Sequence, residues 1–261
     1  MRDLITSTAN GHVKRIRSLV RSRKERHHER MFVVEGIRLV EEALSHSELA
    51  SALYLPEHLG ATARGRALLD RLERLPGAAP TTAAILAQLT DVETPQGVIA
   101  AVSQPALAPA VLSLALVLDG VQDPGNVGTL LRSAEAAGAD LVICLRGTAD
   151  VWSPKVVRSG MGAHFRLPLM VDVDWADVRP QFPADIRLYA ATQDASLAYD
   201  QADWRQPAAL VVGNEGNGVS AQTLELAEPI TIPMLGAVES LNAAIAGSVL
   251  LFEAARQRRS A

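Results

Sequence analysis

Three loops, each directly after an apolar run of strand length, hold the polar residues that could do chemistry. The first begins after Leu118 and carries Asn126, Gly128 and Arg132 at the start of an expected helix. Gly128 and Arg132 are four residues apart and therefore share a helix face, which leaves room beside the guanidinium. A guanidinium there could pair with a phosphate and stabilise developing negative charge. The alternative is a capped helix with a surface arginine.

The second loop is rich in glycine. Gly213, Gly216 and Gly218 follow the apolar run that begins at Leu210, with Glu215 between them. Such a loop lets the main chain approach a flat ligand and offers amide donors to it. The spacing matches neither the dinucleotide fingerprint nor the P-loop. Because Glu215 would repel phosphates, a neutral or cationic ligand suits this loop.

The third loop follows Ile232 and leads into the last helix. Ser240 is the expected N-cap of that helix, with Asn242 two residues inside it. A Ser-x-Asn pair at a helix start is also explained by capping alone, so this loop is uninformative by itself.

The elements that would position these loops alternate between strand and helix patterns from residue 114 onward. Apolar strands separated by helices predict a parallel sheet covered on both faces, an α/β fold in which ligands bind beyond the carboxyl ends of the strands. The expected strands are Leu114–Leu118, Leu141–Leu145, Leu167–Val171, Arg187–Ala191, Leu210–Val212 and Ile230–Ile232, and the expected helices are Asn126–Ala137, Pro154–Gly162 and Ser240–Arg258.

A smaller α/β domain is expected upstream. Its predicted helices are Gly11–Lys24 and Gly36–Leu44, and its predicted strands are Phe32–Val34, Ala52–Leu55 and Val98–Val102. The Pro/Ala-rich stretch that starts at Gln104 has no periodic pattern and reads as a linker. We therefore expect domains at 1–103 and 113–261, joined by a linker at 104–112.

Positive charge is concentrated at the N-terminus. The chain carries a net charge of −4, yet residues 1–30 hold nine Lys and Arg against three acids, which gives +6 there and −10 elsewhere. Clustered cations suit contact with the phosphates of a nucleic acid, although a solvated basic helix face is the alternative. Besides Arg2 and Arg30, which belong to the same cluster, the candidate residues for this contact, and for RNA binding if the partner is RNA, are Lys14, Arg15, Arg17, Arg21, Arg23, Lys24 and Arg26.

Several protein classes are disfavoured by what the sequence lacks. It has no apolar run of about 18 residues, and its charged start does not suit a signal peptide, so a cytoplasmic protein is expected. The single cysteine, Cys144, lies in an apolar run and reads as a core residue. The six histidines lack metal-ligand spacing, so we expect no metal.

Taken together, the three loops resemble a known family. Asn126-x-Gly-x-x-x-Arg132, Gly213-x-Glu215-x-x-Gly218 and the segment from Ile232 to Asn242 resemble, in this order, the signature motifs of the SpoU (TrmH-like) family in the SPOUT superfamily. The upstream domain is similar to an L30e-like RNA-binding domain through Phe32–Gly36 and the basic helix before it.

The resemblance implies an activity and a fold. It implies an S-adenosylmethionine-dependent methyltransferase that modifies a ribose 2′-hydroxyl of structured RNA, with rRNA favoured over tRNA. It also implies a homodimer and a deep trefoil knot in the catalytic domain, which general topology rules would not predict.

Site residues follow from the same resemblance. Those matched to the cofactor are Gly213, Ile232 and Leu241, with Asn214, Gly218, Met234 and Thr192 nearby; those matched to catalysis are Arg132, Asn126, Glu215, Ser240 and Asn242. Arg132 is expected to pair with a substrate phosphate and stabilise charge on the 2′-oxygen. Ser240 and Asn242 would orient the ribose, and Glu215 would hold either the arginine or the cofactor ribose.

Two other hypotheses about the function remain open. A non-catalytic RNA-binding or ribosome-assembly protein could keep the fold without turnover, and methyl incorporation into RNA would separate it from an enzyme. A nicotinamide-dependent Rossmann enzyme is disfavoured because no dinucleotide fingerprint follows any strand.

Overall fold

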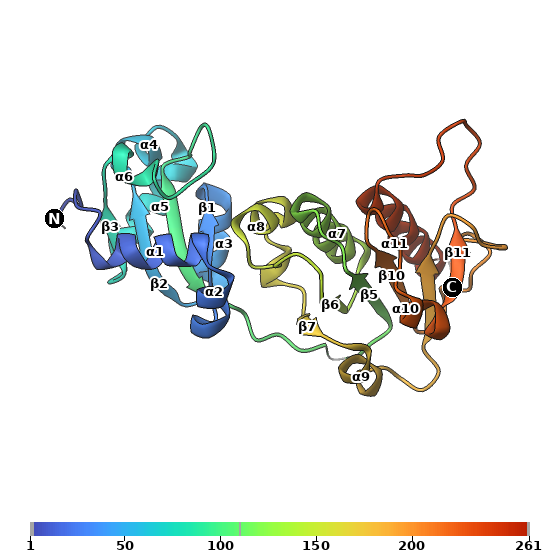
Figure 1. The fold of residues 1–261 in the computed structure, drawn as a ribbon. Coiled ribbons are helices and arrows are strands. Elements are labelled where there is room, and N and C mark those ends of the chain that lie inside the picture. The colour runs from blue at the N-terminus through green and yellow to red at the C-terminus, as the bar shows by residue number, and fades with distance from the viewer. Residues whose placement is uncertain (1–2, 110, 260–261) are drawn as a thin grey trace. The chain divides into compact units, whose positions relative to one another are not determined.

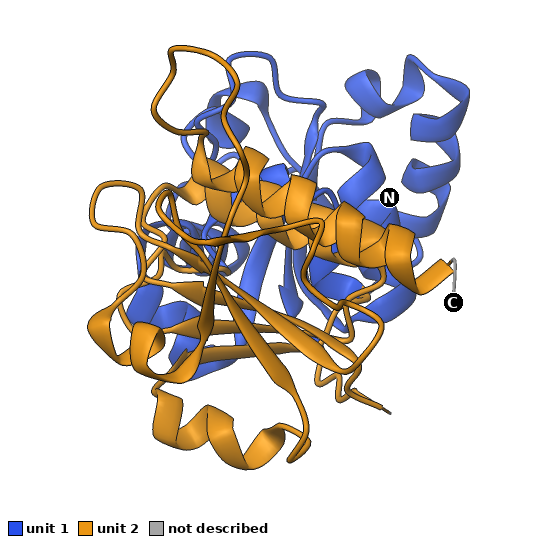
Figure 2. Cartoon of the chain, turned by 90° about the vertical axis from the view of Figure 1, so that its right-hand side faces the viewer, with its two compact units in different colours: residues 1–105, 152–165 blue, residues 106–151, 166–261 orange. Residues whose placement is uncertain are grey.

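Residues 3–109 and 111–259 are described by a computed structural model. Arg2 of the basic N-terminal stretch and Ala110 of the expected linker lie outside the described residues. The chain forms two compact units, one made of residues 1–105 and 152–165 and the other of 106–151 and 166–261 (Figure 2). The sequence placed residues 152–165 in the second domain, whereas the structure packs them in the first unit. The division into functional domains at 1–103 and 113–261, with a linker at 104–112, stays a prediction.

The second unit is built on a seven-stranded, wholly parallel sheet (Figure 1). Its strands, in spatial order, are β7 (Leu169–Val173), β6 (Leu141–Leu145), β5 (Leu114–Asp119), β10 (Ala208–Gly213), β8 (Arg187–Ala191), β11 (Glu228–Thr231) and β9 (Leu197–Ala198). The central strands β5, β6 and β10 are buried almost throughout because both faces are covered. The predicted parallel α/β fold is confirmed, and the knot stays a prediction.

Two helix layers cover this sheet. On one face, α7 (Pro124–Ala137) and α11 (Ala243–Arg259) lie side by side (Figure 1). Gly247 makes their close approach possible, because a side chain there would overlap Leu130 of α7. On the other face, Trp175 and Val178 of α9 (Trp175–Val178) pack in one apolar cluster with strand residues such as Val117. The helix α10 (Ala221–Leu226) contacts β8 on the sheet.

All strands point the same way, so their carboxyl ends meet at one edge of the sheet. The loops after β5, β10 and β11 leave from this edge, and these are the three loops with the candidate motifs. The strand β11 ends at Thr231, so Ile232 belongs to the loop, not to the strand expected at Ile230–Ile232. Residues 232–242 form a long projecting loop between β11 and α11 (Figure 1).

The first unit contains a four-stranded mixed sheet. Its order is β1 (Met31–Glu35), β4 (Val98–Ser103), β2 (Leu49–Tyr54) and β3 (Ala78–Pro80). The helices are α1 (Gly11–Arg21), α2 (Arg23–Glu29), α3 (Ile37–His46), α4 (Pro56–Gly60), α5 (Ala63–Leu72) and α6 (Ala83–Leu86). Apolar residues of α1, including Ile16, pack with sheet residues such as Leu53. The single basic helix expected at Gly11–Lys24 is broken at Ser22, whose side chain caps α2.

Residues 152–165 complete the first unit by covering its edge strand β1. This segment contains α8 (Pro154–Gly160) and the 3₁₀ turn η1 (Ala163–Phe165). The ring of Phe32 on β1 lies 5.0 Å from that of Trp152 and 5.6 Å from that of Phe165. Covering an edge strand protects it from pairing with another chain, and the first four residues of β1 are buried.

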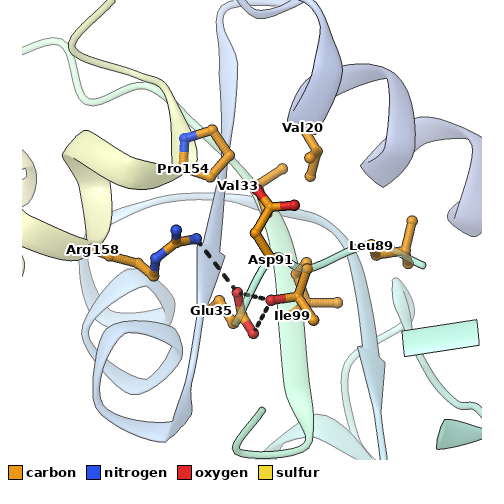
Figure 3. A pocket seen from close by; sticks show the side chains of 9 residues that line it. Val20, Val33, Glu35, Leu89, Asp91, Ile99, Pro154 and Arg158 are labelled. Atoms are coloured by element: carbon orange, nitrogen blue, oxygen red, sulfur yellow. Dashed lines mark hydrogen bonds and ion pairs between the residues drawn. The ribbon is translucent and has the colours of Figure 1, made fainter. Parts of the chain in front are cut away.

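An ionic cluster beside β1 adds to this packing (Figure 3). The Thr90 hydroxyl lies within hydrogen-bonding distance of both Glu35 carboxylate oxygens, at 2.6 and 2.7 Å, and Arg158 of α8 lies 3.8 Å from the same carboxylate. Burial raises the pKa of Glu35, although Thr90 and Arg158 act in the opposite direction. The cavity beside them measures about 10 Å³, which is about the smallest volume that can hold one water molecule.

Within residues 3–109 and 111–259, no helix is both long and apolar enough to cross a membrane.

Candidate active site

The Glu215 carboxylate joins the second motif loop to the first. One carboxylate oxygen accepts hydrogen bonds from the Asp123 amide at 3.0 Å and the Asn126 side-chain amide at 2.9 Å, while the other accepts from the Gln122 amide at 3.0 Å. Partial burial alone would raise the pKa of Glu215, but these donors stabilise the charged form and lower its pKa below the ordinary value. Glu215 therefore holds the first loop, and its expected role toward Arg132 or the cofactor ribose stays a prediction.

The Asn126 side chain continues this connection to the third loop. Its amide nitrogen donates to Glu215, so its oxygen is left to accept from the Asn242 side-chain nitrogen at 3.0 Å. Because a carboxylate can only accept hydrogen bonds, the Asn126 side-chain nitrogen must face Glu215. The Asn126 oxygen then faces Asn242, whose side-chain nitrogen must be the donor. Glu215, Asn126 and Asn242 thus form one hydrogen-bonded path across all three motifs.

Asn242 also begins the last helix. Its side-chain oxygen accepts hydrogen bonds from the Ala244 amide at 2.9 Å and the Ile245 amide at 3.2 Å. The expected cap, Ser240, lies two residues too early, because α11 starts at Ala243. Ser240 is exposed, and among the described residues no side-chain hydrogen bond engages it. The helix-cap explanation of this motif therefore applies to Asn242 and leaves Ser240 without a structural role.

The glycine loop folds back on the end of β10. Asn214 and Gly218 pair through two main-chain hydrogen bonds of 2.8 and 2.9 Å, which close a tight turn. A Cβ on Gly213 would overlap the main chain of Gly218 and Val219, and Gly218 has a φ of +69°. The Asn214 side chain donates to the Gly120 carbonyl at 2.9 Å and accepts from the Gly216 and Asn217 amides. Asn214 therefore fixes the shape of this loop and ties it to Gly120.

Thr148, after β6, was not singled out in the sequence. Its buried hydroxyl donates to the Leu118 carbonyl at 2.9 Å and accepts from the Gly120 amide at 3.2 Å, which ties a fourth loop to the first. The only sequence signal is a polar residue after a buried strand, and this signal is too common to be selective.

Arg132 lies on α7, on the same helix as Asn126. Its side chain is exposed, and among residues 3–109 and 111–259 no hydrogen bond or ion pair engages its guanidinium. An unengaged guanidinium is available to a phosphate from outside the chain.

Known proteins share this arrangement of motifs and domains. Residues 113–252 match the SpoU rRNA Methylase family, and residues 10–100 match the MRM3-like substrate binding domain. The chain is 33% identical to rRNA methyltransferase 3A, mitochondrial, of Danio rerio, over 93% of this chain and 68% of that protein.

The chain belongs to the SpoU rRNA Methylase family.

Two further relatives of this SpoU chain match over nearly their whole length. The 23S rRNA (guanosine(2553)-2′-O)-methyltransferase RlmP of Bacillus subtilis is 31% identical, over 95% of this chain and 97% of RlmP. The structure of the SpoU methyltransferase AviRb from Streptomyces viridochromogenes, in complex with AdoMet, has 30% identity and a TM-score of 0.82, over 97% of this chain and 100% of AviRb.

The other cofactor candidates of the SpoU motifs lie around the same sheet edge. Ile232, Met234 and Leu241 are half-buried residues of the projecting loop. Thr192 follows β8, and its amide donates to the Ile230 carbonyl at 2.9 Å. Hydrogen bonds thus join Glu215, Asn126 and Asn242, while Asn214 bonds to the Gly120 carbonyl and within its own loop. Within the described residues, no hydrogen bond links Arg132 or Ser240 to that network.

The basic candidates in the N-terminal region do not all face solvent. Arg26 is only 5% exposed and donates to the Leu19 and Val20 carbonyls at the end of α1. It satisfies carbonyl groups that the end of a helix leaves open, so its assignment as an RNA contact is corrected. Arg15 is paired with Glu29 at 2.9 Å.

The remaining basic candidates lie on the surface of α1 and α2. Lys14, Arg17 and Arg21 share one face of α1, being three and four residues apart. Lys24 and Arg23 are exposed on α2.

Among the residues the structure describes, no group of three or more His, Cys, Asp and Glu side chains is arranged to hold a metal ion.

Proposed function

We propose that this chain transfers the methyl group of S-adenosylmethionine to a ribose 2′-hydroxyl of rRNA. One observation carries the proposal: the path from Glu215 through Asn126 to Asn242 joins the three family motifs at one edge of the sheet. Six residues after Asn126, the same helix α7 presents an unengaged, exposed arginine, Arg132. RlmP is named as a 2′-O-methyltransferase of 23S rRNA, and the mitochondrial relative is named as an rRNA methyltransferase.

The loop after β10 suits S-adenosylmethionine. Its turn is fixed by its own hydrogen bonds, and no heavy atom lies within 4 Å of the place where a Cβ would stand on Gly218, so the main chain is open to a flat ligand. The half-buried Ile232, Met234 and Leu241 offer apolar contacts, and Thr192 offers a hydroxyl. The cofactor supplies an electrophilic methyl group on a sulfonium.

In the reaction, a bond forms between the ribose 2′-oxygen and the methyl carbon while the carbon–sulfur bond breaks. The electron pair of that bond stays on sulfur, so S-adenosylhomocysteine leaves, and the proton of the 2′-hydroxyl is released to solvent water. Arg132 pairs with the neighbouring RNA phosphate and stabilises the negative charge that develops on the 2′-oxygen. Ser240 and Asn242 orient the ribose, and Glu215 keeps the first loop and Asn126 in place. Positioning of this kind can lower a barrier by about 7 to 11 kcal/mol.

A homodimer is part of this proposal. Ile245 and Phe252 are 54% and 49% exposed and stand seven residues apart on α11, which places them on one face of that helix. Exposed large apolar side chains in a row favour burial against a second copy of the same surface. Replacing Phe252 with Glu is expected to produce monomers in analytical ultracentrifugation, and an unchanged dimer would exclude this face.

A cytoplasmic location stays a prediction, since the relatives include a bacterial 23S rRNA enzyme and mitochondrial enzymes.

The function is tested by transfer of a labelled methyl group to rRNA by the purified chain. We expect incorporation at a ribose, stopped by Arg132→Ala, while calorimetric titration shows that the variant still binds S-adenosylmethionine. Absence of transfer by the unaltered chain, together with intact RNA binding, would favour the non-catalytic RNA-binding protein. Full transfer by Arg132→Ala would remove the mechanism.

A further inference from the structure

Asp119, the last residue of β5, lies beside the glycine loop but belongs to none of the three motif patterns. It pairs in register with Gly213, the last residue of β10, so the two parallel strands end side by side. The glycine loop leaves from Gly213 and returns to the sheet edge at Ser220, the N-cap of α10.

One carboxylate oxygen of Asp119 holds the returning end of this loop. It accepts a hydrogen bond of 2.7 Å from the Ser220 amide and one of 2.6 Å from the Thr223 hydroxyl. Charge-assisted hydrogen bonds are stronger than those between neutral groups, and short distances are typical of them. The exit of the loop is therefore tied to the same strand end from which the first motif loop departs.

Thr223 is fully buried, and its hydroxyl has a complete set of partners. While it donates to Asp119, it accepts from the Trp175 indole nitrogen at 3.0 Å and from the Ser220 hydroxyl at 3.1 Å. A hydroxyl has a single proton, and the two donors that point at its oxygen direct that proton to Asp119. Because an indole nitrogen can only donate, the buried Trp175 helps to fix the direction of the hydrogen bonds from Thr223 to Asp119.

The loop is held at three points, all by the end of β5 and the segment that follows it. Its entry is held by the bond from Asn214 to the Gly120 carbonyl, its middle by Glu215, and its exit by Asp119. The first two anchors lie within the family motifs, whereas Asp119 does not. Without it, the exit of the loop would be held only by the cap that Ser220 makes on α10.

We propose that Asp119 is a positioning residue for S-adenosylmethionine, acting through the Ser220 amide and the Thr223 hydroxyl to fix the main chain of residues 213–220. The inference rests on the proposed function, because it takes that loop as the cofactor site. Asp119 touches neither reactant. Its effect should therefore fall on cofactor affinity more than on the rate at saturating cofactor or on RNA binding.

The test measures S-adenosylmethionine affinity by calorimetry, together with kcat and KM on rRNA, for the full chain and four variants. Asp119→Ala is expected to weaken cofactor binding on the order of tenfold or more, since it removes two charge-assisted hydrogen bonds. Asp119→Asn keeps an oxygen acceptor and should recover most of that affinity. Thr223→Val should weaken cofactor binding in the same direction, and its matched control Thr223→Ser, which keeps the hydroxyl, should not.

Equal cofactor affinity in Asp119→Ala and the unaltered chain would overturn this inference and leave the proposed function intact. An equal loss in Asp119→Asn and Asp119→Ala, accompanied by an equal loss of RNA affinity, would show a purely structural role and would also overturn it. If Asp119→Ala does not fold, the Thr223 pair decides, and equal affinity in the Val and Ser variants would refute the inference. A chain that binds no S-adenosylmethionine before any substitution would instead refute the proposed function.

Discussion

The carboxylate of Glu215 accepts three hydrogen bonds, and all three come from the segment that follows β5. This pattern explains why a carboxylate stands in a glycine loop. Glu215 satisfies amide groups at the start of α7 and orients Asn126, and this role needs an acceptor with two oxygens. The sequence indicated that a loop containing Glu215 is a poor phosphate site, because a carboxylate repels phosphate. Only the structure identifies the hydrogen-bond partners of Glu215.

Replacing Glu215 with Gln is expected to destabilise the fold, because the amide group would present a donor to an amide donor. The pKa of Glu215 is lowered by folding from its ordinary 4.5, so its carboxylate stabilises the fold above that value. This contribution is lost as the pH falls through the lowered folded-state pKa. Urea denaturation over a pH series should show a stability difference between the two chains at neutral pH that vanishes in acid. A difference that is constant with pH would contradict this role of the carboxylate.

Cys144 and Arg26 show which side-chain environments a sequence pattern predicts and which it does not. Burial raises the pKa of Cys144 to about 12, which agrees with its reading as an unreactive core residue. Arg26 shows the opposite outcome, because nothing in a run of basic residues marks the one whose guanidinium turns inward to the carbonyls of α1.

At the scale of elements, the sequence anticipated the parallel sheet well. β6 and β8 have the expected limits, Leu141–Leu145 and Arg187–Ala191, because buried parallel strands are continuous apolar runs bounded by turn residues. The two-residue strand β9 was missed because it is too short for any periodicity. The start of α11 was misplaced because Ser240 and Asn242 are both good caps, and the choice between them depends on Asn126, which lies far away in the chain.

Substitution of the two candidate caps of α11 distinguishes them. Asn242→Ala is expected to lower the free energy of unfolding by about 1 kcal/mol or more, since removal of an N-cap costs about 0.5 to 2 kcal/mol. It also removes the bond to Asn126. Ser240→Ala, the matched control, should leave stability unchanged. Chemical denaturation measures both, and a larger loss for Ser240→Ala would show that the cap is misassigned.

The basic face of α1 and α2 is a second element with a testable role. Lys14, Arg21 and Lys24 are exposed, and no protein group among the described residues pairs with them. Reversing their charge is expected to weaken rRNA binding and to flatten its salt dependence, by about 0.7 to 0.9 in log–log slope for each RNA phosphate that is no longer neutralised. Arg179→Glu, in the second unit, is the control and should leave the slope unchanged. A slope that stays the same in the triple variant would make this face a solvated surface.

At the scale of the molecule, residues 152–165 pack in a different unit from the residues that precede and follow them in the chain. Residues 152–165 lie between β6 and β7 of the parallel sheet in the chain, but they pack on β1 of the first unit. Sequence patterns report local periodicity, and the aromatic contacts of Phe32 with Trp152 and Phe165 span more than a hundred residues. Such a non-local contact could not be inferred from either segment by itself.

The packing predicts that Trp152 stabilises the first unit. Trp152→Ala is expected to cost about 3 to 5 kcal/mol, as for other buried aromatic residues. Hydrogen exchange should rise in β1, Met31–Glu35, because its covering segment loosens. Leu224→Ala, an exposed site on α10, serves as the control. Exchange that rises only in the second unit would contradict the assignment of this segment.

The central claim is that three loops assemble one site for methylation of a ribose in rRNA. The most direct measurement maps 2′-O-methylated riboses in total RNA from a strain that lacks this chain, and from the same strain carrying either the unaltered chain or Arg132→Ala. We predict that a ribose methyl group in rRNA disappears on deletion, returns with the unaltered chain and stays absent with Arg132→Ala. An identical methylation map in all of these strains would contradict the claim.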